Sequence, residues 1–272
     1  NRHQEVVRTL ILKDGLNYGQ LPKALLEFHK CIGTSRAALE EHLAEGAQYA
    51  ACADGSVNIH FTVSDDHLNL MALRIEEAKA VFEHQYGVKY DISMSVQKPS
   101  TDTVAANMDG TPYRENGELF FRPGGHGALI ENLNDLDGDV IFIKNIDNVV
   151  PDSFRESTIT YKQVIGGVLV EAKSRIDQYA EALRNGKASE ADMDEMLQFM
   201  RQTLCITNDN AESMTADEKK QYILAKLNRP IRVCGMVRNE GEPGGGPCLA
   251  YNPDGTISLQ ILESSQIDMA DP

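Results

Sequence analysis

Apolar residues recur at steps of three and four along several stretches of the chain, and this spacing predicts amphipathic helices. The first helical face holds Leu39, Leu43, Ala47 and Ala50. The second holds Leu68, Met71, Leu73, Ile75 and Ala78, and Ser64 stands where it would cap the start of that helix. Between and after these faces the period changes, and the runs Asn58–Val63 and Ile92–Val96 predict strands.

The middle of the chain predicts an inserted ribbon followed by a loop, a helix and a strand. Two strong turn dipeptides, Asp109-Gly110 and Asn116-Gly117, lie between short apolar runs, so residues 101–122 are expected to form an antiparallel β-ribbon. The Gly-rich segment Pro123–Gly127 and a helical stretch from Ala128 to Leu136 come next. The uninterrupted apolar run Asp139–Ile143 then predicts a buried strand.

The last third of the chain predicts helices first and strands afterwards. Apolar steps of three and four, with a second helical run beginning at Ser189 and a capping box at Thr215 with Glu218, indicate a helical insertion over residues 153–227. Three later runs predict strands: Val233–Val237, Cys248–Tyr251 and Ile257–Leu262.

Alternating helices and strands predict the α/β class, with a mostly parallel sheet flanked by helices. We expect residues 1–272 to form a single domain, with the ribbon and the helical insertion as additions. The chain starts inside a helical pattern and stops soon after a strand, so we expect it to be a fragment of a longer protein.

Composition narrows the choice of partners and compartment. The 272 residues carry a formal net charge of -15, which argues against binding a nucleic-acid polymer through its phosphates. Local backbone N–H groups can still bind a small phosphate ligand. The five cysteines are odd in number and form no CxxC pair, and the sequence has neither a signal peptide nor an apolar span of membrane length. These features favour a cytoplasmic protein with reduced thiols and no membrane partner.

The Gly-rich segment is the most informative candidate for chemistry. Gly124, Gly125 and Gly127 surround His126, and glycines allow a backbone to approach a base or a phosphate closely. The alternative is a plain tight turn between the ribbon and the next helix, and the pattern alone leaves both possibilities open.

Three other side chains are candidates at the ends of predicted strands or helices. Asp147 follows the predicted strand Asp139–Ile143, where a carboxylate suits Mg²⁺, or it serves only in a turn or a cap. Lys23 could contact a triphosphate as a point charge, although an ordinary exposed lysine is the simpler interpretation. Gln97, just after Ile92–Val96, could bond a base or ribose, or lie on the surface.

Near the end of the chain, two features could contact a sugar. Gly245 lies in the flexible loop Glu242–Pro247, and Glu263 follows the strand Ile257–Leu262. A linker and a solvated glutamate are the alternatives. The sequence has no zinc-ligand spacing, no GxSxG elbow and no P-loop lysine signature.

The order of these features resembles the uridylyltransferase family that includes UDP-sugar and UDP-N-acetylglucosamine pyrophosphorylases. Four segments carry the resemblance: Leu21-Pro22-Lys23, Pro123–Gly127, Asn145-Ile146-Asp147-Asn148 and Leu262-Glu263-Ser264, with Gly235-Met236-Val237 and Gln97 as looser matches. Nearly the whole chain is similar to a bacterial family defined as a domain of unknown function and grouped with these transferases. The family's amino-terminal triphosphate-binding Gly-rich loop has no counterpart in Asn1–Gln20.

The resemblance implies a GT-A-like, Rossmann-like fold and transfer of a nucleotidyl group from UTP or another nucleoside triphosphate to a sugar 1-phosphate, with Mg²⁺ as cofactor. It implies that Lys23 contacts phosphate, that Asp147 holds the metal, and that Gln97 and Gly124–Gly127 bind the nucleotide. Gly245 and Glu263 would bind the sugar. A nucleotide-sugar-dependent glycosyltransferase and a non-catalytic nucleotide-sugar-binding protein stay open, because fold and metal ligand alone do not separate these functions.

Overall fold

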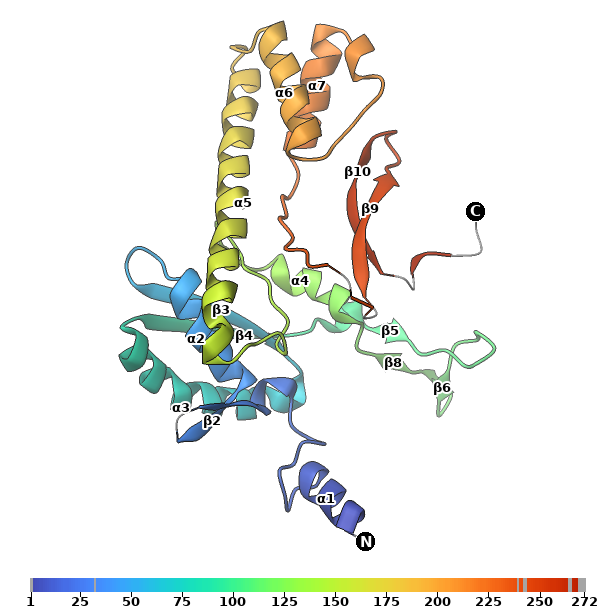
Figure 1. Cartoon of the computed structure of the whole chain (residues 1–272). Coiled ribbons are helices and arrows are strands. Elements are labelled where there is room, and N and C mark those ends of the chain that lie inside the picture. The colour runs from blue at the N-terminus through green and yellow to red at the C-terminus, as the bar shows by residue number, and fades with distance from the viewer. Residues whose placement is uncertain (1, 32, 239, 242–243, 264–265, 269–272) are drawn as a thin grey trace. The chain divides into compact units, whose positions relative to one another are not determined.

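The computed structural model describes residues 2–31, 33–238, 240–241, 244–263 and 266–268. The chain, which the sequence predicts as one domain, divides into two compact units, Asn1–Gln163 and Val164–Pro272. The mixed α/β class is confirmed, since helices and small sheets alternate along the chain (Figure 1). None of the helices in the described segments is both long and apolar enough to cross a membrane.

The first unit contains most of the strands. Its helices are α1 (Arg2–Ile11), α2 (Ala38–Tyr49), α3 (Leu68–Tyr86), the short α4 (Ile130–Leu133) and the start of α5 (Arg155–Arg184). Its strands are β1 (Glu27–Cys31), β2 (Thr34–Ala37), β3 (Ser56–Val63), β4 (Lys89–Val96), β5 (Thr103–Val104), β6 (Arg114–Glu115), β7 (Glu118–Leu119) and β8 (Phe121–Arg122). Short 3₁₀ helices are η1 (Lys23–Leu25), η2 (Asp65–His67), η3 (Pro99–Thr101), η4 (His126–Leu129) and η5 (Asp152–Phe154).

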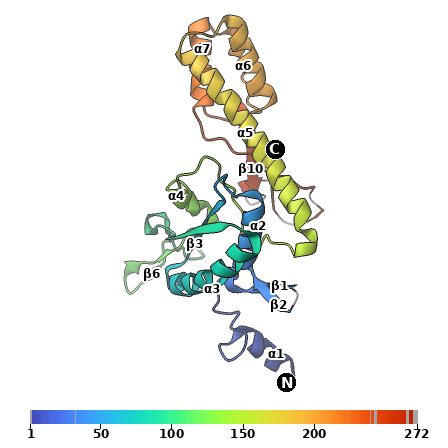
Figure 2. The same ribbon diagram turned by 90° about the vertical axis from the view of Figure 1, so that its left-hand side faces the viewer.

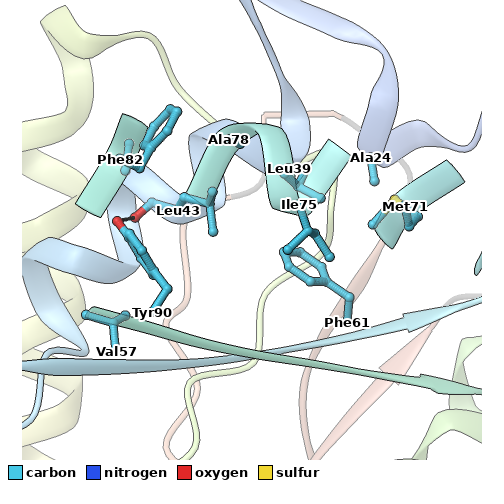
Figure 3. Close-up of a cluster of buried hydrophobic side chains, with 11 residues drawn as sticks. Ala24, Leu39, Leu43, Val57, Phe61, Met71, Ile75, Ala78, Phe82 and Tyr90 are labelled. Atoms are coloured by element: carbon cyan, nitrogen blue, oxygen red, sulfur yellow. Dashed lines mark hydrogen bonds between the residues drawn. The ribbon is translucent and has the colours of Figure 1, made fainter. Parts of the chain in front are cut away.

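The core of the first unit lies between the parallel pair β3–β4 and the helices α2 and α3. Both predicted strands are confirmed, and they pair in register from Ser56↔Lys89 to Val63↔Val96. Alternate residues of the two strands face the helices, which lie on one side of the pair (Figure 3). The buried side chains of this core are Ala24, Leu39, Leu43, Ala44, Val57, Phe61, Met71, Ile75, Ala78, Phe82 and Tyr90.

The mostly parallel sheet that the sequence predicts is not present in the described segments. Each sheet there has two strands, and β3–β4 is the parallel one. The predicted strand Asp139–Ile143 is irregular, and Val140, Ile141 and Ile143 are exposed. An extended segment becomes a strand only when a neighbouring backbone pairs with it. This run packs on a helix instead.

That helix is α2, and the contacts are made by alternate residues of the segment. The Phe142 ring meets the Tyr49 ring edge-on, with centroids 5.1 Å apart, and Lys144 pairs with Glu45. The side chain of Ile146 packs against the core of the first unit. The segment that the apolar run predicted as a buried strand therefore packs on α2 through alternate side chains.

The predicted ribbon over residues 101–122 folds as two short antiparallel pairs, β5–β8 and β6–β7 (Figure 1). Both predicted turns are confirmed, because Gly110, Asn116 and Gly117 adopt positive φ angles of 81°, 52° and 88°. These angles favour Gly and Asn.

The predicted cap at Ser64 is not made by its side chain, since the Ser64 hydroxyl contacts His67 Nδ1 instead.

The second unit holds the end of α5 together with α6 (Glu190–Gln202), η6 (Ala211–Ser213), α7 (Ala216–Leu227) and the hairpin β9 (Gly245–Tyr251) and β10 (Ile257–Glu263). α6 and α7 lie beside the end of α5 (Figure 2). The predicted capping box is present, with Thr215 Oγ1 accepting from the Glu218 N–H. A second capping box stands at the predicted helix start Ser189, whose Oγ accepts from the Asp192 N–H.

The strand predictions for the second unit had mixed outcomes. The runs Cys248–Tyr251 and Ile257–Leu262 are confirmed as parts of β9 and β10, which pair antiparallel. The run Val233–Val237 is irregular, so that prediction was wrong. Its Met236 and Val237 are exposed, and the apolar pattern there marks neither a core nor a strand.

Candidate functional site

Two of the predicted site residues, Lys23 and Asp147, form an ion pair although they are 124 positions apart. Lys23 Nζ lies 2.6 Å from Asp147 Oδ2. Both side chains are accessible, with 64% of the lysine and 38% of the aspartate exposed. The hydrogen bond from Lys23 lowers the pKa of Asp147, so the carboxylate is ionised at neutral pH and able to bind a cation.

The neighbours of each residue explain why the pair forms. Lys23 begins η1, and the next residue, Ala24, is buried in the core. Ile146 is likewise packed against the core, and its carbonyl oxygen lies 3.0 Å from His42 Nε2. Anchored residues therefore fix both backbones, and the two charged side chains are left at the surface.

A second contact joins Gln97 to the Gly-rich segment. Gln97 Nε2 donates to the Gly124 carbonyl oxygen at 3.3 Å, and to Thr101 Oγ1 at 3.3 Å. Gly124 is required here, because a Cβ at this position would lie 2.7 Å from the Thr101 carbonyl oxygen. At Gly125 and Gly127 a Cβ would meet none of the described atoms within 4 Å. The backbone from Gly125 to Gly127 is therefore accessible, as is His126.

Both contacts lie toward the carboxyl end of the parallel pair. Gln97 directly follows Val96, which pairs with the last residue of β3. His42, which holds the backbone before Asp147, packs edge-on against Phe61 near the end of β3. In Figure 3, Phe61 lies at the same end of the strands as Ala24, the neighbour of Lys23, and Val57 and Tyr90 lie at the other end. Ligands of open parallel sheets bind at this end.

The two predicted sugar-binding residues lie in the second unit. Gly245 and Glu263 are direct cross-strand partners in β9 and β10. The Glu263 backbone N–H donates to Gln266 Oε1 at 2.9 Å. The structure brings these two residues together, whereas Lys23, Gln97, Gly124–Gly127 and Asp147 belong to the first unit. Glu242, Pro243 and Ser264, which belong to the predicted sugar-binding segments, lie outside the described residues.

A magnesium ion would rely on Asp147. The described residues contain no group of three or more His, Cys, Asp and Glu side chains arranged to hold a metal. Mg²⁺ is commonly bound by one or two carboxylates together with water and substrate phosphates. An accessible, ionised carboxylate beside a lysine fits that mode of binding, in which the substrate completes the site.

Sequence reasoning missed two residues that hold the candidate site in place, His42 and Asn132. His42 lies on α2, three residues after the buried Leu39, where it reads as an ordinary helix position. Asn132 lies in the short helix α4, and its side chain bonds to the end of β4. Neither belongs to a motif, so the sequence carries no signal for them.

The environment of His42 predicts how the stability of the chain depends on pH. Burial lowers the pKa of His42 below its ordinary value of 6.5. As pH falls below that value, the unfolded chain binds a proton that the folded chain does not, so the free energy of unfolding decreases. Because a carbonyl only accepts, the Nε2 atom carries the proton that is shared with Ile146.

We expect His42→Gln to reduce this loss, since a glutamine amide can still donate to the Ile146 carbonyl but does not titrate. The urea midpoint would be measured at about pH 7.5 and about pH 5.5. The control is His84→Gln, because His84 is an exposed histidine on α3. Between these two pH values, wild type and His84→Gln should lose more free energy of unfolding than His42→Gln. Equal losses of stability in all three proteins would show that the titration of His42 does not cause the loss.

Comparison with known proteins gives one family. Searches against curated proteins and against solved structures gave no match. The family model described as a domain of unknown function, DUF4301, matches residues 1–272. The chain therefore belongs to the DUF4301 family.

Proposed function

We propose that this chain acts as a sugar-phosphate nucleotidyltransferase. It would transfer a nucleotidyl group from UTP or another nucleoside triphosphate to a sugar 1-phosphate and release pyrophosphate. The contact of 2.6 Å between Lys23 Nζ and Asp147 Oδ2 is the observation that carries this proposal. It joins the two residues for which the resemblance implies phosphate and metal binding, and both are accessible.

Three further features support the proposal. Gln97 and Gly124, expected to bind the nucleotide, are in contact. Both pairs lie toward the carboxyl end of β3–β4, as ligand sites do in GT-A-like and other parallel α/β folds. The backbone from Gly125 to Gly127 is open enough for a base to approach. A GT-A-like fold related to the UDP-sugar pyrophosphorylases is part of the proposal.

In this function the chain would act mainly by positioning and charge neutralisation. Lys23 would contact the triphosphate, Asp147 would hold Mg²⁺, and Gln97 with Gly124–Gly127 would seat the base. Bound Mg²⁺ neutralises charge on phosphate oxygens. For the sugar, the resemblance implies Gly245 and Glu263, which belong to the second unit. The attacking group is the phosphate oxygen of the sugar 1-phosphate, so no side chain of the protein needs to act as a nucleophile.

We expect UTP with Mg²⁺ to raise the melting temperature of the protein, and Asp147→Ala to abolish that rise. A ligand present at about 100 times its dissociation constant stabilises by about 2.7 kcal/mol, which corresponds to a shift of roughly 5–10 °C for a unit of this size. Asp177→Ala is the matched control, because Asp177 also pairs with a lysine at 2.6 Å and is accessible, but lies on α5 in the second unit.

The choice of ligands separates the proposal from its alternatives. Stabilisation by UTP that needs both Mg²⁺ and Asp147, with pyrophosphate released when a sugar 1-phosphate is added, supports nucleotidyl transfer. Stabilisation only by nucleotide-sugars would instead indicate a glycosyltransferase or a non-catalytic binding protein. If no nucleotide stabilises the protein, the proposal is wrong.

A further inference from the structure

Asn132 is a buried side chain that fastens α4 to the end of β4. Only 3% of the residue is exposed. Its Nδ2 atom donates to the Val96 carbonyl oxygen at 2.9 Å and to Ser95 Oγ at 2.8 Å. Val96 is the last residue of β4, and Gln97 is next in the chain. The amide of Asn132 therefore holds the backbone from which the Gln97 side chain extends.

The orientation of this amide follows from its partners. A carbonyl oxygen only accepts, so the NH₂ group of Asn132, and not its oxygen, faces Val96. Both N–H bonds are then used, and Oδ1 points away from them. Oδ1 is buried without a hydrogen-bond partner among the described residues. A buried acceptor left unpaired costs free energy, so the two donated bonds determine the position of this residue.

Asn132 and Gln97 make two separate connections between the end of β4 and the stretch from Gly124 to α4. Gln97 follows β4 and donates to Gly124 at the start of the Gly-rich segment. Asn132 lies after that segment, in the helix that continues it, and donates back to β4. Together they fix the loop at both ends against one strand end, and leave the backbone of Gly125–Gly127 accessible between them.

The other partner of Asn132 is also held in place. Ser95 Oγ lies 2.8 Å from His60 Nε2, and His60 Nδ1 lies 2.8 Å from Ser93 Oγ. These residues lie on the face of β3–β4 that is turned away from the core, where side chains of a parallel pair are usually apolar. The chain of bonds from Ser93 to Asn132 gives the amide a fixed acceptor in addition to the backbone.

We propose that Asn132 is a positioning residue of the nucleotide site, which sets the distance between Gln97 and the Gly-rich loop that would seat the base. The proposal rests on the proposed function, and deepens it by naming a residue that no motif identifies. It predicts that Asn132 matters for the base half of a nucleotide and not for the phosphates, which Lys23 and Asp147 would contact.

The test compares UTP with pyrophosphate, which has phosphates but no base. Dissociation constants of both would be measured with Mg²⁺ for wild type, Asn132→Ala and Asn134→Ala. Asn134 is an exposed asparagine two residues later, and serves as the matched control. Loss of two donated bonds should weaken UTP binding by about tenfold or more. Pyrophosphate binding should change by less than about twofold, and Asn134→Ala should match wild type.

A second variant covers the case in which Asn132→Ala does not fold. Ser95→Ala removes one of the two acceptors but leaves the Val96 carbonyl in place, so it should weaken UTP binding by about threefold and spare pyrophosphate. Folded variants that bind UTP as wild type does, or that lose UTP and pyrophosphate equally, would overturn the positioning role. If wild type binds neither ligand, the proposed function and this inference both fall.

Discussion

Glu41→Ala should destabilise the first unit by about 3 to 5 kcal/mol, because it removes the central carboxylate of a buried charge cluster. Glu41 is fully buried on α2. Its Oε2 atom pairs with Arg155 Nη2 and lies 3.6 Å from Arg36 Nη1, and its Oε1 lies 3.2 Å from His29 Nδ1. Without Glu41, two poorly exposed guanidinium groups would share only Asp152, whose side chain is 56% exposed.

The cluster holds segments that are distant in sequence. Arg36 lies in β2, Glu41 in α2, and Arg155 at the start of α5. Breaking a buried ion pair leaves a charge without compensation, whereas removing an exposed pair costs at most about 1 kcal/mol. Asp177→Ala, at an exposed pair on α5, is therefore the comparison.

Urea unfolding measures the difference. Glu41→Ala should lower the midpoint strongly, Glu41→Gln should lower it as well because the amide lacks the charge, and Asp177→Ala should lie near wild type. A Glu41→Ala protein within about 0.5 kcal/mol of wild type would show that the cluster contributes little to stability.

Helices and their caps were the part of the fold that the sequence predicted best. The apolar steps around Leu39 and Leu43 give α2, and the helix start at Ser189 and the capping box at Thr215 are present as predicted. These features depend on residues within one or two turns of each other, so the pattern contains most of the information.

Sheet membership could not be predicted in the same way, because pairing depends on a distant backbone. The run Asp139–Ile143 has the composition of a buried strand, yet Phe142 and Lys144 pack on α2. An uninterrupted apolar run indicates only that some of its side chains are covered. Whether a strand or a helix covers them is decided by the rest of the fold.

The residues of the candidate site also fall into two groups, those that the sequence identified and those that it did not. The resemblance identified Lys23, Gln97, Gly124 and Asp147, and the structure places them as two contacting pairs. His42 and Asn132, which hold the site in place, were missed because each acts through a partner more than ten positions away in the chain. A buried polar side chain has no sequence signature when its partner belongs to another element.

In the second unit, Phe199→Ala should destabilise by about 3 to 5 kcal/mol. Phe199 lies on α6 and is 3% exposed. Its ring meets the Tyr179 ring edge-on, with centroids 5.4 Å apart, and Arg175 Cζ lies 4.5 Å from the ring centroid. Truncation would remove the apolar contacts with α5 and leave a cavity, since a packed core collapses only in part.

Phe154 provides the control for this prediction, because it has the same side chain at 68% exposure. Phe154→Ala should change stability by less than about 0.5 kcal/mol. Phe199→Leu keeps most of the buried volume but loses the aromatic contacts, so it should lie between wild type and Phe199→Ala. If urea unfolding gave equal midpoints for Phe199→Ala and Phe154→Ala, α6 would not be packed against α5 through this ring. The order of these three variants therefore tests the helix packing of the second unit independently of any ligand.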